Sequence, residues 1–207
     1  MKIQIDKTYP IPCRAEVAWE FLQKLEAVAG CMPGAKITER LDATHYKGTI
    51  TARVGPVTMA FRGEVEMKDV DASARSLRLL GKGTDTTGTS GAAMSLTARI
   101  EPTADGLCAL SGTSEMSMSG KAATFGGRMM NTVAEQILQQ FAANFAVQVS
   151  ALAGQRAATG GAAAGGGGAP ASAVPVPAAQ VRELNVLALA WSIFQNWLRR
   201  LFARKVA

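Results

Sequence analysis

Residues 154–180 limit where this chain can build a hydrophobic core. The segment reads GQRAATGGAAAGGGGAPASAVPVPAAQ, with two valines as its only large apolar residues and Arg156 as its only charge. Such a composition buries too little apolar surface to offset the entropy lost on ordering, and its glycine-rich part is typical of a flexible tether. We therefore expect a folded domain over residues 1–153, a flexible linker over 154–180 and a separate C-terminal segment over 181–207.

Alternation of apolar and polar side chains predicts strands in the middle of the domain. The clearest case is VTMAFRGEVEMKDV, which begins at Val57, and AAMSLTARI and LCALSGTSEMSMSG follow the same pattern. HYKGTITARVGP, SLRLLGKG and a first strand over Lys2 to Thr8 bring the expected number of strands to six or seven. One face of these strands is apolar, as in an antiparallel sheet with one side against the core.

Two segments have the spacing of amphipathic helices. CRAEVAWEFLQKLEAVAG predicts one helix after the first strand, and a long helix is predicted from Phe125 to about Ala153. Its apolar stripe contains Phe125, Met129, Met130, Val133, Ile137, Phe141 and Phe145. Because only this helix is long enough to cover the apolar face, we predict an α+β fold in which a curved antiparallel sheet wraps around the long helix.

The cysteines and the single histidine argue against a metal centre and a disulfide framework. Cys13, Cys31 and Cys108 lack C-x-x-C spacing, and His45 is the only histidine, so no metal cofactor is predicted. The opening MKIQIDKTYPIP lacks the pattern of a secretory leader. We therefore expect a cytoplasmic protein.

The net charge of +6 is concentrated near the C-terminus. The last 27 residues carry +4, which leaves +2 for the rest of the chain. This uneven distribution disfavours an extended basic surface for binding nucleic acid on the main domain. The basic residues of the C-terminal segment are Arg182, Arg199, Arg200, Arg204 and Lys205, and its one acidic residue is Glu183.

Several short motifs add a family resemblance to this order of elements. They are CMPGA, VGPVTMAFRG, GKGTDTTGTSGAAM, SGKAATFGGRMM and QFAANF. Over residues 1–153 the chain resembles the carbon monoxide dehydrogenase G-subunit family, a branch of the START-like (SRPBCC) helix-grip superfamily. The resemblance implies a helix-grip pocket for an apolar molecule. It also implies a non-catalytic role in docking a molybdenum-containing carbon monoxide dehydrogenase, or a related oxidoreductase, at the membrane.

An isoprenoid quinone is the carried ligand that we expect, because such a dehydrogenase must pass electrons to the membrane pool. Flexible methionines are frequent among the inward-facing side chains, and they suit both a cavity for an apolar ligand and a plain packed core. A pure scaffold or assembly factor without ligand therefore stays open. The predicted lining of the pocket is Met59, Phe61, Met94, Leu96, Met116, Met118, Phe125, Met129, Val133, Ile137 and Phe141.

A small hydrolase or cyclase built in the same cavity is the enzymatic alternative. It would need an inward acid or base, but the candidates Glu115 and Arg99 face outward by alternation, and His45 has no Ser or Cys partner near it in the sequence. The GKG at Gly81 and the GKAA at Gly120 lack the hydroxyl residue of a phosphate-binding loop. We therefore predict no catalytic residue.

The C-terminal segment predicts attachment to a membrane surface. Leu184 to Leu198 contains no charge, but it is shorter than the about 20 apolar residues of a spanning helix. An amphipathic basic helix at the inner face of the cell membrane fits better, with tryptophans at headgroup depth and basic residues on anionic lipids. The predicted membrane-binding residues are Leu187, Trp191, Phe194, Trp197, Leu198, Arg199, Arg200, Leu201, Phe202, Arg204 and Lys205.

Two other roles for this segment stay open. It could dock on its own domain or on a partner protein, since amphipathic helices do not by themselves identify the surface they bind. It could also insert into the bilayer at a shallow tilt with its arginines on the cytosolic side, as the positive-inside rule permits.

Overall fold

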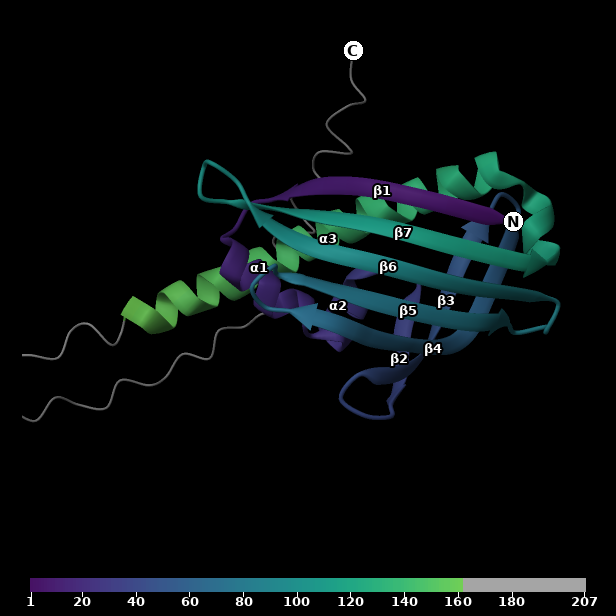
Figure 1. Cartoon of the computed structure of the whole chain (residues 1–207), viewed down its shortest axis with the longest axis horizontal. Coiled ribbons are helices and arrows are strands. Elements are labelled where there is room, and N and C mark those ends of the chain that lie inside the picture. Colours follow the sequence, from purple (N-terminus) through teal and green to yellow (C-terminus); the bar gives the residue numbers. More distant parts are fainter. Residues whose placement is uncertain (162–207) are drawn as a thin grey trace, which may run out of the picture. The chain divides into compact units, whose positions relative to one another are not determined.

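Seven antiparallel strands form one curved sheet in the order β1-β7-β6-β5-β4-β3-β2 (Figure 1). This computed structural model describes residues 1–161, and the predicted segment 181–207 lies outside them. The elements in chain order are β1 (Lys2–Ile11), α1 (Ala15–Leu22), α2 (Leu25–Cys31), β2 (Ala35–Arg40), β3 (His45–Val54), β4 (Val57–Asp71), β5 (Ser76–Asp85), β6 (Ser90–Pro102), β7 (Cys108–Gly120), the 3-10 helix η1 (Lys121–Phe125) and α3 (Gly127–Gly161).

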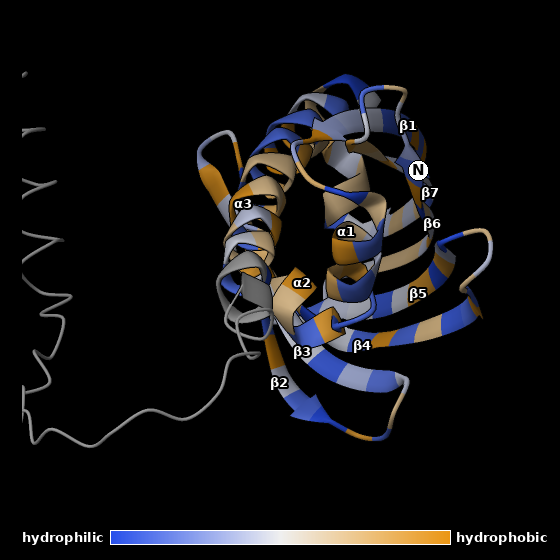
Figure 2. Cartoon of the chain, turned by 90° about the vertical axis from the view of Figure 1, so that its left-hand side faces the viewer, coloured by the Kyte–Doolittle hydropathy of each residue, from blue (hydrophilic) through white to orange (hydrophobic). Residues whose placement is uncertain are grey.

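The sheet curves around α3, which confirms the predicted α+β helix-grip fold. Strands β2 to β7 follow one another as hairpins, and β1 pairs with β7. Figure 2 shows α3 and α1 inside the curve of the strands. The sequence predicted one helix after β1, but the structure has two, because Lys24, with φ −90° and ψ 79°, leaves the helical path between α1 and α2. Helix α3 continues to Gly161, beyond the end predicted at Ala153.

The strand connections gather at two ends of the sheet, because consecutive antiparallel strands alternate in direction. One end, here called the tip, contains the N-terminus, the β3–β4 turn, the β5–β6 loop, η1 and the first turn of α3 (Figure 1). Backbone bonds join these parts, since Lys121 N–H donates to Thr89 O and Met118 N–H to Met1 O. The other end, here called the helix end, contains α1, α2 and the turns after β2, β4 and β6.

Three glycines on neighbouring strands allow the sheet to curl. Gly48, Gly63 and Gly83 are direct cross-strand partners on β3, β4 and β5. A Cβ atom at Gly63 would lie 2.0 Å from the carbonyl oxygen of Lys82, and one at Gly83 would lie 2.9 Å from that of Arg62. Glycine in a strand interior commonly marks such a bend or close backbone approach. This glycine row lets the β3–β5 part of the sheet bend around α3.

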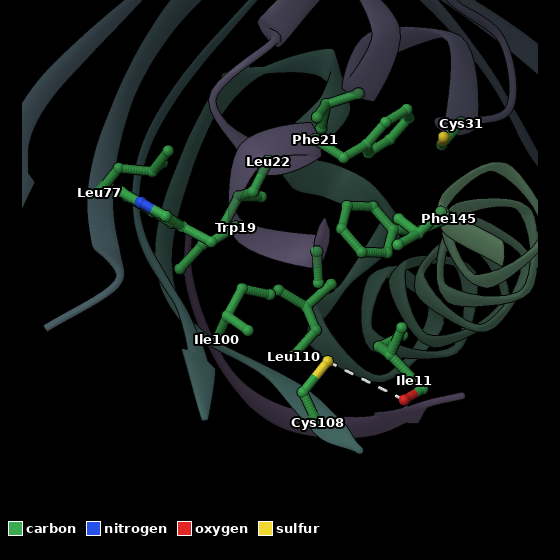
Figure 3. Close-up of a cluster of buried hydrophobic side chains, with 14 of the residues drawn as sticks. Ile11, Trp19, Phe21, Leu22, Cys31, Leu77, Ile100, Cys108, Leu110 and Phe145 are labelled. Atoms are coloured by element: carbon green, nitrogen blue, oxygen red, sulfur yellow. Dashed lines mark hydrogen bonds between the residues drawn. The ribbon is translucent and has the colours of Figure 1, made fainter. Parts of the chain in front are cut away.

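Two hydrophobic cores fill the inner face of the sheet. The helix-end core packs α1 and α2 against the sheet and α3, with Phe145 fully buried at its centre (Figure 3). The Phe21 and Phe145 rings meet edge to face with centroids 5.2 Å apart. The tip core is smaller and contains Ile3, Val54, Met59, Phe61, Met118, Ala122 and Met130. The molecule is therefore closed by packed side chains at both ends of the sheet.

Candidate ligand-binding site

The candidate site lies between the sheet and α3, midway between the two cores. Val65, Gly81, Met94 and Met116 form one continuous row of cross-strand partners from β4 to β7. The Met94 methyl group lies over Gly81, 3.3 Å from where a Cβ atom would stand there. These side chains are only half-buried although they point toward the helix. The side chains at the centre of the interior are thus more exposed than those of the two cores.

The structure distributes the predicted lining residues among the two cores and the centre. Three are buried in the tip core: Met59, Phe61 and Met118. Three more are half-buried against it: Met116, Phe125 and Val133. Two are half-buried against the helix-end core: Leu96 and Phe141. Met94 and Ile137 are half-buried and belong to neither core. These ten residues all lie on the inner side, as predicted from their spacing.

Met129 is the exception, and its placement in the lining was wrong. Its side chain is 40% exposed at the tip, and Met130 takes the buried position instead. The reason is the phase of the helix: at about 100° per residue, Met129 lies roughly 160° around the axis from the buried Phe145, whereas Met130 lies within about 60°. A stripe of residues four apart drifts around a long helix, so its first member no longer faces the sheet.

Asp85 is the one buried charged residue in the described part of the chain, and sequence reasoning missed it. Its carboxylate accepts hydrogen bonds from Thr87 Oγ1 at 2.6 Å, Thr89 Oγ1 at 3.0 Å and Ser90 N–H at 3.0 Å. The Thr87 bond is the main cause that holds the pKa of Asp85 below its usual range. Ser90 Oγ in turn accepts the N–H of Ala122, which ties η1 to the β5–β6 loop. The Asp-Thr-Thr-x-Thr-Ser sequence was the available signal, since short polar residues around an Asp favour such local bonds.

An ion pair joins the edge strand to the helix. Lys7 Nζ on β1 lies 2.6 Å from Glu135 Oε1 on α3, and the hydrogen bond and charge of Glu135 raise the pKa of Lys7. Both side chains are about half exposed. An exposed pair of this kind contributes little to stability, so its main effect is to align α3 with β1.

The residues considered for catalysis lie on the outside of the domain. Glu115 and Arg99 are exposed on the outer face, as their alternation predicts. His45 does have partners, because Nδ1 lies 2.8 Å from Asp42 Oδ2 and Nε2 lies 3.2 Å from Glu66 Oε1. These contacts are on the surface, and among the described residues no Ser or Cys nucleophile is bonded to the ring. The arrangement is that of a satisfied surface histidine.

Two hollows open on the outer face of the sheet and not at the predicted interior site. The larger has a volume of about 610 Å³ and follows the glycine row between Arg62, Glu64 and Lys82. The smaller, of about 390 Å³, lies beside Arg78 and Glu115. Both are open to solvent and are lined by a mixture of polar and apolar groups.

Within residues 1–161, no group of His, Cys, Asp and Glu side chains is arranged to hold a metal ion. None of the helices over the same residues is both long and apolar enough to span a bilayer. The predicted membrane-binding residues, Leu187 to Lys205, lie outside the described residues.

Comparisons with solved structures show the same fold in distant proteins. A conserved protein from Geobacillus kaustophilus aligns with a TM-score of 0.65 at 20% identity, covering 72% of this chain and 95% of its own. The ZhuI aromatase/cyclase from Streptomyces sp. R1128 aligns with a TM-score of 0.52 at 14% identity, covering 72% and 94%. At these identities the similarity concerns the fold alone.

Sequence comparison identifies the family. A comparison with curated protein sequences gives no significant match. In contrast, the family model for the G subunit of carbon monoxide dehydrogenase (CoxG) matches residues 8–150, which is nearly the whole sheet together with α1, α2 and most of α3. The chain therefore belongs to the carbon monoxide dehydrogenase G-subunit (CoxG) family.

Proposed function

We propose that this protein is a non-catalytic accessory of a carbon monoxide dehydrogenase-type molybdenum oxidoreductase, and that it carries an isoprenoid quinone between the sheet and α3. The match of the CoxG family model over residues 8–150 is the observation that carries the proposal. The quinone is argued from chemistry, because a dehydrogenase of this kind must pass its electrons to an acceptor in the membrane.

The centre of the interior suits an apolar guest. Met94 and Ile137 belong to neither core and are half-buried from opposite sides, on β6 and α3. Methionine side chains are flexible and polarisable, so they can repack around a ligand of irregular shape. Two charged groups at the edges of the domain have partners: Asp85 is hydrogen-bonded in its loop, and Lys7 is paired with Glu135. An apolar ligand bound in the interior would therefore not deprive either of these charged groups of its partner.

The C-terminal segment supplies the second part of the proposal, recruitment to the inner face of the cell membrane. Trp191 and Trp197 would sit at headgroup depth, and Arg199, Arg200 and Arg204 would meet anionic lipids. The Gly-rich sequence before it has the composition of a flexible tether, which would keep the domain close to both the bilayer and the enzyme.

The test is mass spectrometry of an organic extract from the full-length protein, purified without detergent from cells with a normal quinone pool. Two variants on the same strand form a matched pair: Met94→Glu places a charge on the inner face, and Ala93→Glu places it on the outer face, where Ala93 is exposed. We expect quinone with the wild type and with Ala93→Glu, and its loss with Met94→Glu, because an apolar ligand would remove water from the new carboxylate without giving it a partner.

Both variants keep the C-terminal segment, so lipid bound there would remain in both extracts. A cooperative thermal melt must first show that Met94→Glu is folded. If Met94→Ala, which adds no charge, were used as a milder variant, quinone content should fall partly. Equal quinone in all folded variants, or none in the wild type, would contradict the carrier and favour a scaffold.

A further inference from the structure

The two ends of the sheet differ in charge. The segments that build the tip are residues 1–5, 51–59, 86–93 and 117–132, and they contain no Asp or Glu. They do contain Lys2, Arg53, Lys121 and Arg128, all exposed. Within residues 1–161, none of these four side chains has an acidic partner within ion-pair distance. The surface of the tip is therefore positively charged.

The helix end differs from the tip because it contains both acidic and basic residues, the latter including Arg14, Arg40 and Arg75. Its three hairpin turns each contain an aspartate, namely Asp42, Asp71 and Asp105. Each accepts a hydrogen bond from a backbone N–H two residues further on, at Thr44, Ser73 and Leu107 respectively. Hydrogen bonds hold the pKa of each carboxyl below its usual value, and the main donor is the Thr44 N–H for Asp42, the Ser73 hydroxyl for Asp71 and the Thr103 hydroxyl for Asp105. Negative charge is thus fixed at the end away from the tip.

The tip also exposes apolar side chains beside its basic residues. Val57 is 41% exposed and Met129 is 40% exposed. Met129 lies against the β3–β4 turn, because its methyl group is 3.2 Å from where a Cβ atom would stand at Gly55, two residues before Val57. Arg53 flanks them on β3 and Arg128 on α3. The basic residues and the apolar pair come from different elements and meet at one end.

We propose that the tip, with Val57 and Met129 at its apolar centre and Arg53, Lys121 and Arg128 around it, is a docking surface for an anionic phospholipid bilayer. Apolar side chains that enter the headgroup boundary, surrounded by basic residues, are the features of a surface that binds in the membrane interface. This contact is separate from the one proposed for the C-terminal segment. It would present the tip to the lipid and keep the aspartate turns of the helix end away from the negative surface.

The charge pattern favours a bilayer over a protein partner. The exposed apolar area is small and consists of two flexible or branched side chains, whereas stable protein interfaces bury larger and better packed patches. An anionic bilayer needs no shape complementarity, and each basic residue near its surface strengthens binding. Asp85, at the edge of the tip, is buried and hydrogen-bonded, so it does not face the lipid. The small apolar centre and the basic rim therefore fit a lipid surface.

Vesicle binding of the full-length protein tests the proposal. The vesicles consist of phosphatidylcholine with or without phosphatidylglycerol, and they contain no quinone. The variant Arg53→Gln/Lys121→Gln/Arg128→Gln is compared with Lys24→Gln/Lys47→Gln/Lys68→Gln, which makes the same charge change at sites away from the tip. We expect the partition coefficient for anionic vesicles to fall about tenfold or more for the tip variant and much less for the control.

The apolar centre has its own matched pair. Val57→Ser/Met129→Gln is compared with Val70→Ser/Leu107→Gln, whose residues are 46% and 39% exposed at the helix end. Only the first pair should weaken binding. In the wild type, anionic vesicles should slow hydrogen exchange over residues 53–58 and 121–130, and phosphatidylcholine vesicles should do so far less.

Two outcomes would overturn the proposal. If both tip variants partition like their controls and exchange slows only outside the tip, the domain does not dock through this surface. If vesicle binding of the tip variants is unchanged and a separate pull-down shows that they no longer bind the purified oxidoreductase, the surface belongs to a protein partner instead. The vesicle assay contains neither quinone nor dehydrogenase. A negative result there would therefore contradict the docking surface only, and the quinone carrier is tested separately by the extract experiment.

Discussion

Cys13 Sγ lies 3.9 Å from Cys108 Sγ, where the end of β1 meets the start of β7. Both thiols are free and buried, and Cys108 also lies close to the carbonyl oxygen of Ile11 (Figure 3). Burial raises the pKa of Cys108 to about 12 and also raises that of Cys13. A raised pKa keeps a thiol protonated, and the protonated form is a poor nucleophile. The pair is therefore part of the core and not a reactive site.

We expect these thiols to be inert in the folded protein. At pH 8 a water-soluble disulfide reagent should modify the cysteines of the native chain very slowly, because all three are buried and their pKa values are raised. In denaturant all three should react at once. Mass spectrometry counts the modified residues. Rapid modification of Cys108 before unfolding would contradict the packing of the helix-end core.

Phe145 should be the most sensitive apolar position of α3. It is fully buried and contacts the rings of both Phe21 and Phe141. Phe145→Ala should lower the free energy of unfolding by about 3–5 kcal/mol. Val147→Ala, at a position that is 67% exposed, should change it by less than about 0.5 kcal/mol. Urea denaturation of the two variants measures the difference, and equal losses would mean that α3 does not pack as described.

Two Gly→Ala substitutions, one in the glycine row and one in α2, should have opposite effects on stability. Gly63→Ala would place its Cβ 2.0 Å from Lys82 O, so neighbouring strands must move apart, at a cost of about 1–3 kcal/mol or more. Gly30→Ala in α2 has no atom within 4 Å of the new Cβ. It should stabilise the protein by about 0.5–1 kcal/mol, because alanine favours a helix over glycine. Thermal melts compare the two, and a harmless Gly63→Ala would argue against the tight curl.

Asp85 should make stability depend on pH in the acid range. Its pKa is lowered in the folded state, first by the Thr87 hydroxyl, so the folded protein favours the ionised form. This contribution is complete above the unfolded-state pKa of about 3.9 and is lost as the pH falls through the lower folded-state value. Asp85→Asn should therefore destabilise the protein at pH 7, and its deficit should shrink below about pH 4. Urea denaturation at both pH values checks this; a deficit that is independent of pH would contradict it.

The fold was predictable because its signals are periodic. Alternation over Val57 to Val70 and the spacing from Met130 to Phe145 reflect which side of an element is buried, and that is what the sheet and α3 require. The break between α1 and α2 was not predictable, since it depends on the backbone conformation of Lys24. A continuous apolar pattern runs through both helices and hides the break.

The candidate site was predictable only in outline. Alternation places Met94 on the inner face, but it cannot say whether packing around Met94 is tight or loose, because this depends on how far the sheet curls. Met129 was misplaced because a stripe judged by spacing of four ignores the cumulative rotation of the helix. Asp85 was missed because a buried carboxylate is unusual, and only the folded loop shows that three donors surround it.

The separation of charge between the two ends gives the described domain an electric dipole moment along the sheet. With a net charge of +2 over residues 1–161, the domain is attracted to an anionic surface only weakly as a whole. A dipole nevertheless experiences a torque in the field near such a surface, and this torque turns the domain before any contact forms. Orientation during approach is then set chiefly by the basic residues of the tip, which no acidic residue balances there, and salt should weaken it over the Debye length of about 8 Å at physiological ionic strength.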